Sequence, residues 1–269
     1  PTIRSNSQIG ELYLDEVSVK EVTNDLVGYW GLDASRPVSA LKFDGTGDYV
    51  SVGTSLLNAQ SSGTISAWIQ VDTLPSSQSG THLYPAIIAK GNTYLQLVYN
   101  ENKRIIAYMF NDGGAPVTTI NSGDNEIILN TWQHIVLAWD SSSSQLYVDG
   151  VQKYSGSVTW ADVHDGHSNT NVTIGEGQNG SAVSHIGNIS SVAVYDTALT
   201  SSQVSTQYDN GIDSDLSSDS NLVSYWKMDN GSTVSDLKGS NNGTVTNATL
   251  VENAVAFDST ANNNNGALV

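Results

Sequence analysis

The sequence predicts an all-β protein, an antiparallel β-sandwich of the jelly-roll type. In Thr64–Asp72 the odd positions are apolar and the even ones polar apart from Trp68, which is the period of a strand with one face in a core. Asp149-Gly150 separates two alternating runs and favours a tight hairpin turn, because both central residues of such a turn need positive φ. No window of a dozen residues keeps a helical period. Short strands divided by regular turn signals are typical of sandwiches and jelly rolls.

The other predicted elements follow the same period. Residues 11–20 alternate apolar and polar side chains with a slip between Leu14 and Val17, which indicates a bulged strand. Ile135–Trp139 is more uniformly apolar and is expected in the centre of a sheet. Turn sequences such as Asp44-Gly45 separate the further short strands.

The composition excludes several classes of function. The chain has 269 residues, 38% of them hydrophobic, which is enough for a sizeable core. It has no cysteine, so disulfides, thiolate metal sites and cysteine nucleophiles are excluded. A net charge of −17 repels phosphate backbones and anionic bilayers, and no apolar run approaches the roughly 20 residues that cross a membrane. We therefore expect no nucleic-acid partner and no membrane insertion.

An internal repeat sets the expected domain organisation. Asn24–Asp33 (NDLVGYWGLD) recurs as Ser220–Asp229 (SNLVSYWKMD), so the chain is interpreted as a segment of a multidomain array. Three parts are expected. Residues 1–22 would be the closing strand of a preceding jelly-roll domain, residues 23–212 one complete sandwich, and residues 213–269 a linker with the start of a second, incomplete unit.

Five segments in order carry a family resemblance. They are Leu41–Val50, Thr64–Ile69, Thr131–Asp140 leading into Leu146–Gly150, Ile174-Gly175, and Gly187–Leu199. Together they resemble the laminin-G-like jelly-roll domains of the concanavalin-A-like lectin and glucanase superfamily. The resemblance implies an extracellular β-sandwich that binds a surface glycan or polysaccharide. Residues 208–226 are also similar to junctions between such units in phage virion proteins, which implies other subunits of a virion or fibre as partners.

The resemblance raises the question of catalysis, because the superfamily includes endoglucanases with a Glu-x-Asp-x-x-Glu strand. That motif places two carboxylates on one face of a sheet, and the sequence does not contain it. The nearest acidic cluster, Glu11 with Asp15 and Glu16, has the wrong spacing. No Gly-x-Ser-x-Gly turn accompanies a His and an Asp either. We therefore expect no enzyme, and predict that His134, within a strand, has a structural role.

Calcium is the expected cofactor. Asp44-Gly-Thr-Gly-Asp48 offers two carboxylates beside a flexible turn, and hard cations prefer such oxygen ligands. Related domains often hold calcium near this turn with help from an acid on a later strand. Ser190 and Ser191 stand where that acid is expected, so Asp196 is the proposed substitute. The alternative is that Asp44 and Asp48 merely build the turn.

Aromatic and polar side chains in rim loops are the candidate glycan ligands, because sugars stack on flat rings and bond to polar groups. Trp160 is the first choice because it precedes the loop 161–169, and His164 with Asp165 in that loop could meet a sugar or a metal. Tyr84, Tyr94 and Tyr108 complete the candidate set. Ordinary packing, or a polar turn at residues 164–167, is the alternative for each.

Two functions follow from these features. The first is a non-catalytic binding or adhesion module for carbohydrate, carried on a virion or cell-surface appendage. The second is a purely structural virion or fibre building block. A glycoside hydrolase accessory domain is a further alternative, and all three place the chain outside the cell.

Overall fold

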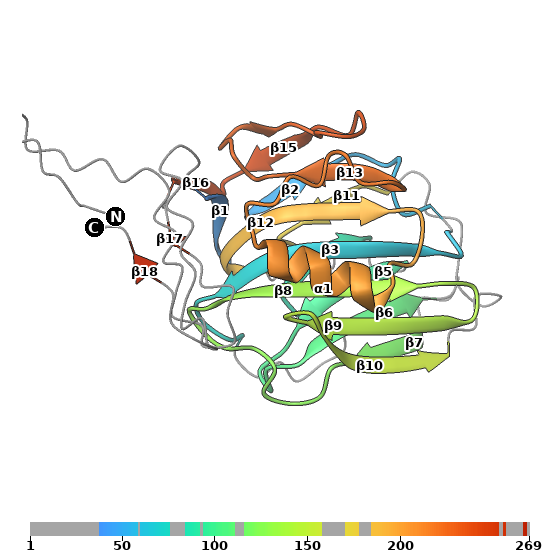
Figure 1. The fold of residues 1–269 in the computed structure, drawn as a ribbon. Helices are drawn as coiled ribbons and strands as arrows, with labels where there is room; N and C mark the ends of the chain where they lie inside the picture. Colours follow the sequence, from blue (N-terminus) through green and yellow to red (C-terminus); the bar gives the residue numbers. More distant parts are fainter. Residues whose placement is uncertain are drawn as a thin grey trace, which may run out of the picture. The chain divides into compact units, whose positions relative to one another are not determined.

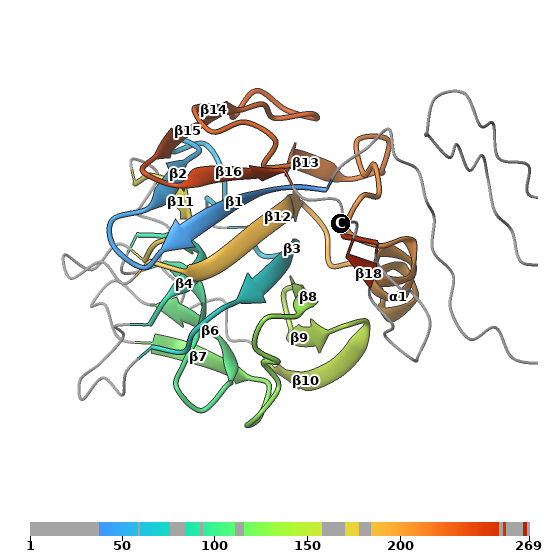
Figure 2. The same cartoon turned by 90° about the vertical axis from the view of Figure 1, so that its left-hand side faces the viewer.

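Two antiparallel sheets of eight strands each form a sandwich in the computed structural model of the chain (Figure 1). The structure describes residues 38–58, 60–75, 84–91, 94–110, 116–157, 170–177 and 184–252, and the backbone of residues 255–256 and 266–267. Figure 2 shows the two sheets as layers, with the helix on the outer side of the first sheet. The predicted all-β jelly-roll sandwich is confirmed.

The first sheet has a single path with one additional strand. Its order is β10 (Val151–Ser157), β9 (Ser143–Val148), β8 (Trp132–Trp139), β3 (Gly63–Val71), β12 (Ile186–Tyr195), β1 (Ser39–Asp44) and β16 (Thr249–Glu252), and β13 (Leu222–Trp226) also pairs with β12. β8 lies between β9 and β3, as expected for the apolar stretch 135–139. The turn between β9 and β10 has positive φ at both Asp149 (52°) and Gly150 (74°). The predicted tight hairpin is therefore confirmed.

The second sheet faces the first across the core. Its order is β14 (Thr233–Val234), β15 (Gly243–Thr246), β2 (Tyr49–Ser51), β11 (Val172–Ile174), β4 (Ala86–Lys90), β5 (Leu95–Tyr99), β6 (Ile105–Phe110) and β7 (Pro116–Asn121). Alternate residues of its central strands, such as Leu95, Leu97 and Tyr99, enter one large apolar cluster with residues from the first sheet. Burial of this cluster between the sheets supplies the main driving force for folding.

β12 carries two strands end to end along one edge. β1 pairs with residues 186–189 and β13 with residues 192–195. Between them the register with β3 shifts between Ser190 and Ala193, which marks a bulge, and Ser191 within it has a φ of 46°. The Ser190 hydroxyl donates to the carbonyl of Ser39 at 2.7 Å and lies 3.3 Å from that of Lys227. Ser190, at a position where an acid was expected, therefore joins the start of β1 to the residue after β13.

The structure differs from the expected boundary at residue 212. β13 joins the first sheet, β15 pairs with β2, and β16 pairs with β1. Residues 39–252 form one compact unit, because the second copy of the repeat and the strands after it extend the sandwich. The first copy, Asn24–Asp33, and the strand expected at residues 11–20 lie outside the described residues. β17 (Val255–Ala256) pairs with β18 (Gly266–Ala267).

A helix that the periodicity did not predict, α1 (Ser201–Asn210), covers the outer face of the first sheet (Figures 1 and 2). Its first turn is closed by a capping box, in which Thr200 accepts a hydrogen bond from the Gln203 backbone and Gln203 accepts one from the Thr200 backbone. Gly211, with a φ of 78°, follows its last turn. In the described part of the chain, no helix is long and apolar enough to cross a membrane.

An aromatic stack lies beneath α1. The rings of Trp68, His134 and Tyr208 stack on one another, with centroid distances from Trp68 of 5.0 Å to His134 and 5.9 Å to Tyr208 of α1, and 6.4 Å between His134 and Tyr208. Trp68 is buried on the face of β3 that points away from the inter-sheet core, where the helix covers it. β3 is consequently buried on both faces, although its sequence alternates.

Candidate functional site

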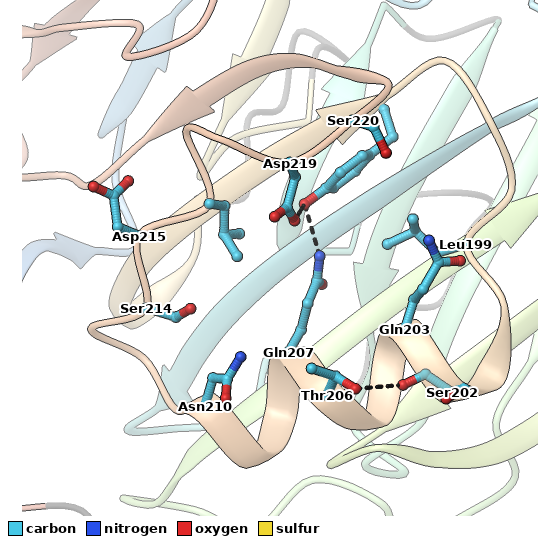
Figure 3. A pocket seen from close by; sticks show the side chains of 12 residues that line it. Leu199, Ser202, Gln203, Thr206, Gln207, Asn210, Ser214, Asp215, Asp219 and Ser220 are labelled. Atoms are coloured by element: carbon cyan, nitrogen blue, oxygen red, sulfur yellow. Dashed lines mark hydrogen bonds between the residues drawn. The ribbon is translucent and has the colours of Figure 1, made fainter.

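A pocket of about 270 Å³ lies between α1 and the segment 214–220 that leads into β13. Figure 3 shows the labelled side chains of both walls around it. Three apolar or aromatic residues, Tyr195, Leu199 and Leu216, line part of it. The rest of the lining is polar, and consists of Ser202, Gln203, Thr206, Gln207, Asn210, Ser214, Asp215, Asp219 and Ser220.

Three side chains form a hydrogen-bonded chain at the floor of the pocket. Gln207 Nε2 donates to the Tyr195 hydroxyl at 2.7 Å, and that hydroxyl donates to Asp219 Oδ2 at 2.9 Å. Burial, followed by the hydrogen bond to Asp219, raises the pKa of Tyr195, so its hydroxyl stays protonated and can donate. Gln207 is only 7% exposed, and its Oε1 has no hydrogen-bond partner among the described residues.

The outer wall of the pocket is fixed by side chains from other elements. The Ser191 hydroxyl donates to the carbonyl of Ile212 at 2.6 Å, and the Tyr225 hydroxyl donates to that of Ser214 at 2.8 Å. Lys238 Nζ donates to the carbonyls of Ser217 and Asp219, both at 3.1 Å. The wall is therefore held in place before any ligand arrives, which lowers the entropic cost of binding.

His134 is buried beneath α1, close to the pocket residue Gln207. Its Nε2 lies 2.8 Å from the Ser66 hydroxyl, and its ring stacks on Trp68. Burial lowers the pKa of His134 to about 3, so the ring is neutral at physiological pH. His134 and Gln207 both line a cavity of about 10 Å³ beneath α1. The structural role predicted for His134 matches this fully buried position.

The expected calcium turn uses its carboxylates to hold its own backbone. Asp48 Oδ2 accepts the Asp44 N–H at 2.6 Å, and Asp44 Oδ1 accepts the Thr46 N–H at 2.9 Å. The Asp48 N–H in turn donates to the Ser184 hydroxyl at 3.1 Å. Asp48 is only 3% exposed, and burial is the main cause that raises its pKa. The geometry fits the alternative role of turn building.

A third acid, Glu176, lies near this turn, and the charge of Asp48 adds to burial in raising the pKa of Glu176. Even so, the described residues include no group of three or more His, Cys, Asp or Glu side chains arranged to hold a metal ion. The side chains as placed do not fit a preformed calcium cage. Calcium binding and turn building therefore stay the two alternatives for Asp44 and Asp48, and the test that separates them is given below.

Asp196 cannot assist the Asp44–Asp48 turn in the way the sequence suggested. Asp44 pairs with Ile186 at the start of β12, whereas Asp196 follows the last residue of that ten-residue strand. At about 3.3 Å per residue, the two acids are separated by roughly 30 Å. The proposed shared metal site is therefore wrong for Asp196.

The predicted aromatic ligands do not form one site. Trp160, His164 and Asp165 lie outside the described residues. Tyr94 is buried in the core at 2% exposure, where its hydroxyl accepts the Gln60 N–H at 3.1 Å, so it cannot contact a ligand. Tyr84 and Tyr108 are half-buried and pack against a small apolar cluster on the face of the second sheet that points away from the core. Among the candidates that the structure describes, Tyr84 and Tyr108 stay together.

The pocket beside α1 was missed by sequence reasoning. Its residues come from a capped helix and an Asp- and Ser-rich turn, neither of which has a catalytic or metal-binding motif. The capping box from Thr200 to Gln203 and the glycine at 211 could have revealed the helix. Amides, hydroxyls and carboxylates around a hollow can bind a polyhydroxylated ligand, because each sugar hydroxyl both donates and accepts.

Comparisons with known proteins agree with this fold. The family model Laminin_G_3, described as the concanavalin A-like lectin/glucanases superfamily, matches residues 44–205, more than half of the chain. A solved structure from Bacteroides ovatus, described as a carbohydrate-binding protein, is 21% identical with a TM-score of 0.62, and covers 81% of this chain and 60% of its own. The chain thus spans less than two thirds of that structure.

Two more distant solved structures are similar to smaller parts of the chain. Domain 4 of a GH43 extracellular arabinanase from Geobacillus stearothermophilus is 20% identical with a TM-score of 0.46, covering 62% of this chain and 75% of its own. The CBM40 of a Ruminococcus gnavus sialidase is 14% identical with a TM-score of 0.48, covering 63% and 96%. Curated protein sequences gave no match. From the family match and the sandwich, the chain belongs to the concanavalin A-like lectin/glucanases superfamily.

Proposed function

We propose that this chain is a non-catalytic module that binds carbohydrate outside the cell, and that the pocket beside α1 is its binding site. One observation carries the proposal. The floor of a 270 Å³ hollow holds a hydrogen-bonded chain of Gln207, Tyr195 and Asp219, and exposed amides and hydroxyls surround it. Such a site is matched to the alternating donors and acceptors of one or two sugar rings. The description of the Bacteroides ovatus structure as carbohydrate binding supports the same class of ligand.

The test is a glycan array probed with the full chain. Asp219→Ala should abolish the strongest hits, because it removes an acceptor from the pocket. Asp209→Ala is the matched control, since Asp209 is an exposed acid on α1 that does not line the pocket. Hits that survive Asp219→Ala but are lost in Trp160→Ala would move the site to the loop 161–169 and overturn the pocket assignment.

The absence of catalysis is part of the proposal. The pocket holds two acids, Asp215 at the rim and Asp219 at the floor, and Asp219 is committed to the Tyr195 hydroxyl. Glycoside hydrolysis requires two carboxylates that flank the scissile bond. Hydrolysis of a laminarin-type glucan by the purified chain, lost in Asp219→Asn, would contradict the proposal.

The place of the module on a virion or cell-surface appendage is a further part of the proposal, and rests on the sequence repeat and on the similarity of residues 208–226 to virion junctions. The purely structural alternative predicts a different result, namely no hit on the array together with self-association of the chain. Sedimentation of the full chain over a range of concentrations measures that association.

A further inference from the structure

The charge of the pocket beside α1 has one sign. Asp215 and Asp219 are among its lining residues, and no Lys, Arg or His is among the side chains that line it. The nearby cation Lys238 is directed to the backbone carbonyls of Ser217 and Asp219. A ligand in this pocket therefore meets two carboxylates and no cationic side chain among the lining residues.

The buried end of Gln207 adds an independent observation. Gln207 is more than nine-tenths buried, lines the pocket, and reaches from α1 toward Asp219 in Figure 3. Its Nε2 is already used by Tyr195, whereas its Oε1 has no partner among the described residues. That oxygen is fully buried, so a ligand donor reaches it once the amide turns toward the pocket, and the bond then recovers the free energy that an acceptor without a partner costs. The floor of the pocket therefore favours hydroxyl or ammonium groups over acceptors.

We propose that the pocket selects neutral or amine-bearing sugars and rejects sugar acids. Hydroxyl and ammonium groups donate to Asp219 and to Gln207 Oε1. A ligand carboxylate would instead face Asp215 and Asp219 within a chain of net charge −17, and like charges at a binding site disfavour association. This inference rests on the proposed function and adds the class of sugar to it.

The experiment compares a neutral sugar with two probes that each differ from it by one group. Binding of methyl glucoside, methyl glucosaminide and methyl glucuronide to the full chain is measured by NMR titration at pH 6, where the amine is protonated. We expect the aminosugar to bind at least as tightly as the neutral sugar, and the acid about tenfold more weakly or worse. Added salt should narrow the gap between amine and acid, because screening weakens charge interactions.

Two variants separate the effect of the charge inside the pocket from the effect of the net charge of the chain. Asp219→Asn keeps an oxygen that can accept a hydrogen bond from the Tyr195 hydroxyl but removes the charge. It should therefore reduce the difference in affinity between the aminosugar and the sugar acid several-fold. Asp209→Asn makes the same change in net charge away from the pocket lining and should leave the gap unchanged. Equal narrowing in both variants, equal affinity for the three probes, or tighter binding of the acid would overturn the selectivity. If no probe binds and the glycan array is also blank, the proposed function itself fails.

Discussion

Two acidic regions of the molecule differ in what their carboxylates hold. At the Asp44–Asp48 turn the carboxylates accept backbone N–H groups four and two residues away, and they close a local loop. Beside α1, Asp219 accepts the Tyr195 hydroxyl from a strand distant in the sequence and faces a hollow. A carboxylate that bonds to the backbone of its own turn stabilises that turn. A carboxylate that bonds to a side chain of another element and lines a pocket can also bind a ligand.

A buried histidine lies close to each region. His134 lies under α1, and His185 directly follows Ser184, whose hydroxyl accepts the Asp48 N–H. His185 packs edge-on against Phe43 and Tyr99, with its Nε2 3.2 Å from the carbonyl of Gln70. Each region therefore lies near a buried, neutral histidine ring, and the two regions differ in the surface groups around them. The predictions below test that distinction.

The largest expected effect concerns the anchoring of β13 in the core of the sandwich. Trp226 of β13 is fully buried, and its Nε1 donates to the carbonyl of Asn241 at 2.8 Å. Trp226→Ala should lower the free energy of unfolding of the sandwich by about 3–5 kcal/mol, measured by urea denaturation. Leu237→Ala, at a 42% exposed side chain, is the control and should cost little. An unchanged sandwich in Trp226→Ala would mean that residues 213–252 are a separate unit after all.

The next effect is a loss of stability in mild acid. Burial lowers the pKa of His134 to about 3 and that of His185 to about 4. At pH values below about 6.5, the ordinary pKa of histidine, these two rings bind protons in the unfolded chain but not in the folded chain. The stability that is present above pH 6.5 is therefore lost as the pH falls toward 4. The free energy of unfolding, measured by urea denaturation at pH 7 and at pH 5, should decline by about 2–4 kcal/mol between the two.

Single variants show how much of that decline in stability comes from the histidine near each region. His134→Gln or His185→Gln should make the dependence on pH shallower, because the substituted side chain cannot take up a proton. A slope that neither variant changes would show that the two rings titrate normally in the folded state.

A smaller effect is expected at the turn. Asp48→Ala leaves the Asp44 N–H without its acceptor and should cost about 1–3 kcal/mol of stability, without changing sugar binding. Asp44→Ala, at an exposed side chain, should cost less. Asp219→Asn should show the reverse pattern, with near-normal stability and weakened binding. Sugar binding lost in Asp48→Ala, with the fold intact, would erase the distinction between the two regions.

The smallest expected effect is that of calcium. With both carboxylates committed to the turn, millimolar CaCl₂ should move the melting temperature no more than MgCl₂ does. A calcium-specific rise that Asp48→Asn abolishes would instead establish the ion site expected from the family resemblance.

Local chemistry explains what the sequence could predict. The Asp149-Gly150 hairpin follows from the φ preferences of two adjacent residues, and the strand at residues 64–72 follows from a period of two. Neither depends on distant parts of the chain. The segments that resemble the family predict the sandwich as well, because they contain these local signals in the order in which the family has them.

Tertiary contacts explain what the sequence could not predict. Trp68 lies on the polar-patterned face of β3, and only the helix above it makes that face a buried one. Asp219 and Gln207 gain their roles from Tyr195, on a strand that neither residue belongs to. The Ser220–Asp229 repeat suggested the start of a second unit and could not show that Leu222–Trp226 pairs with β12 of the same sandwich.

Backbone amide NMR of the full chain, titrated with the strongest glycan from the array, tests the central claim most directly. The account predicts saturable shifts that cluster at residues 195–220 around α1, with little change at residues 44–48 and around Tyr84 and Tyr108. Saturable shifts centred on either of those regions, with α1 unchanged, would contradict the assignment of the pocket as the binding site.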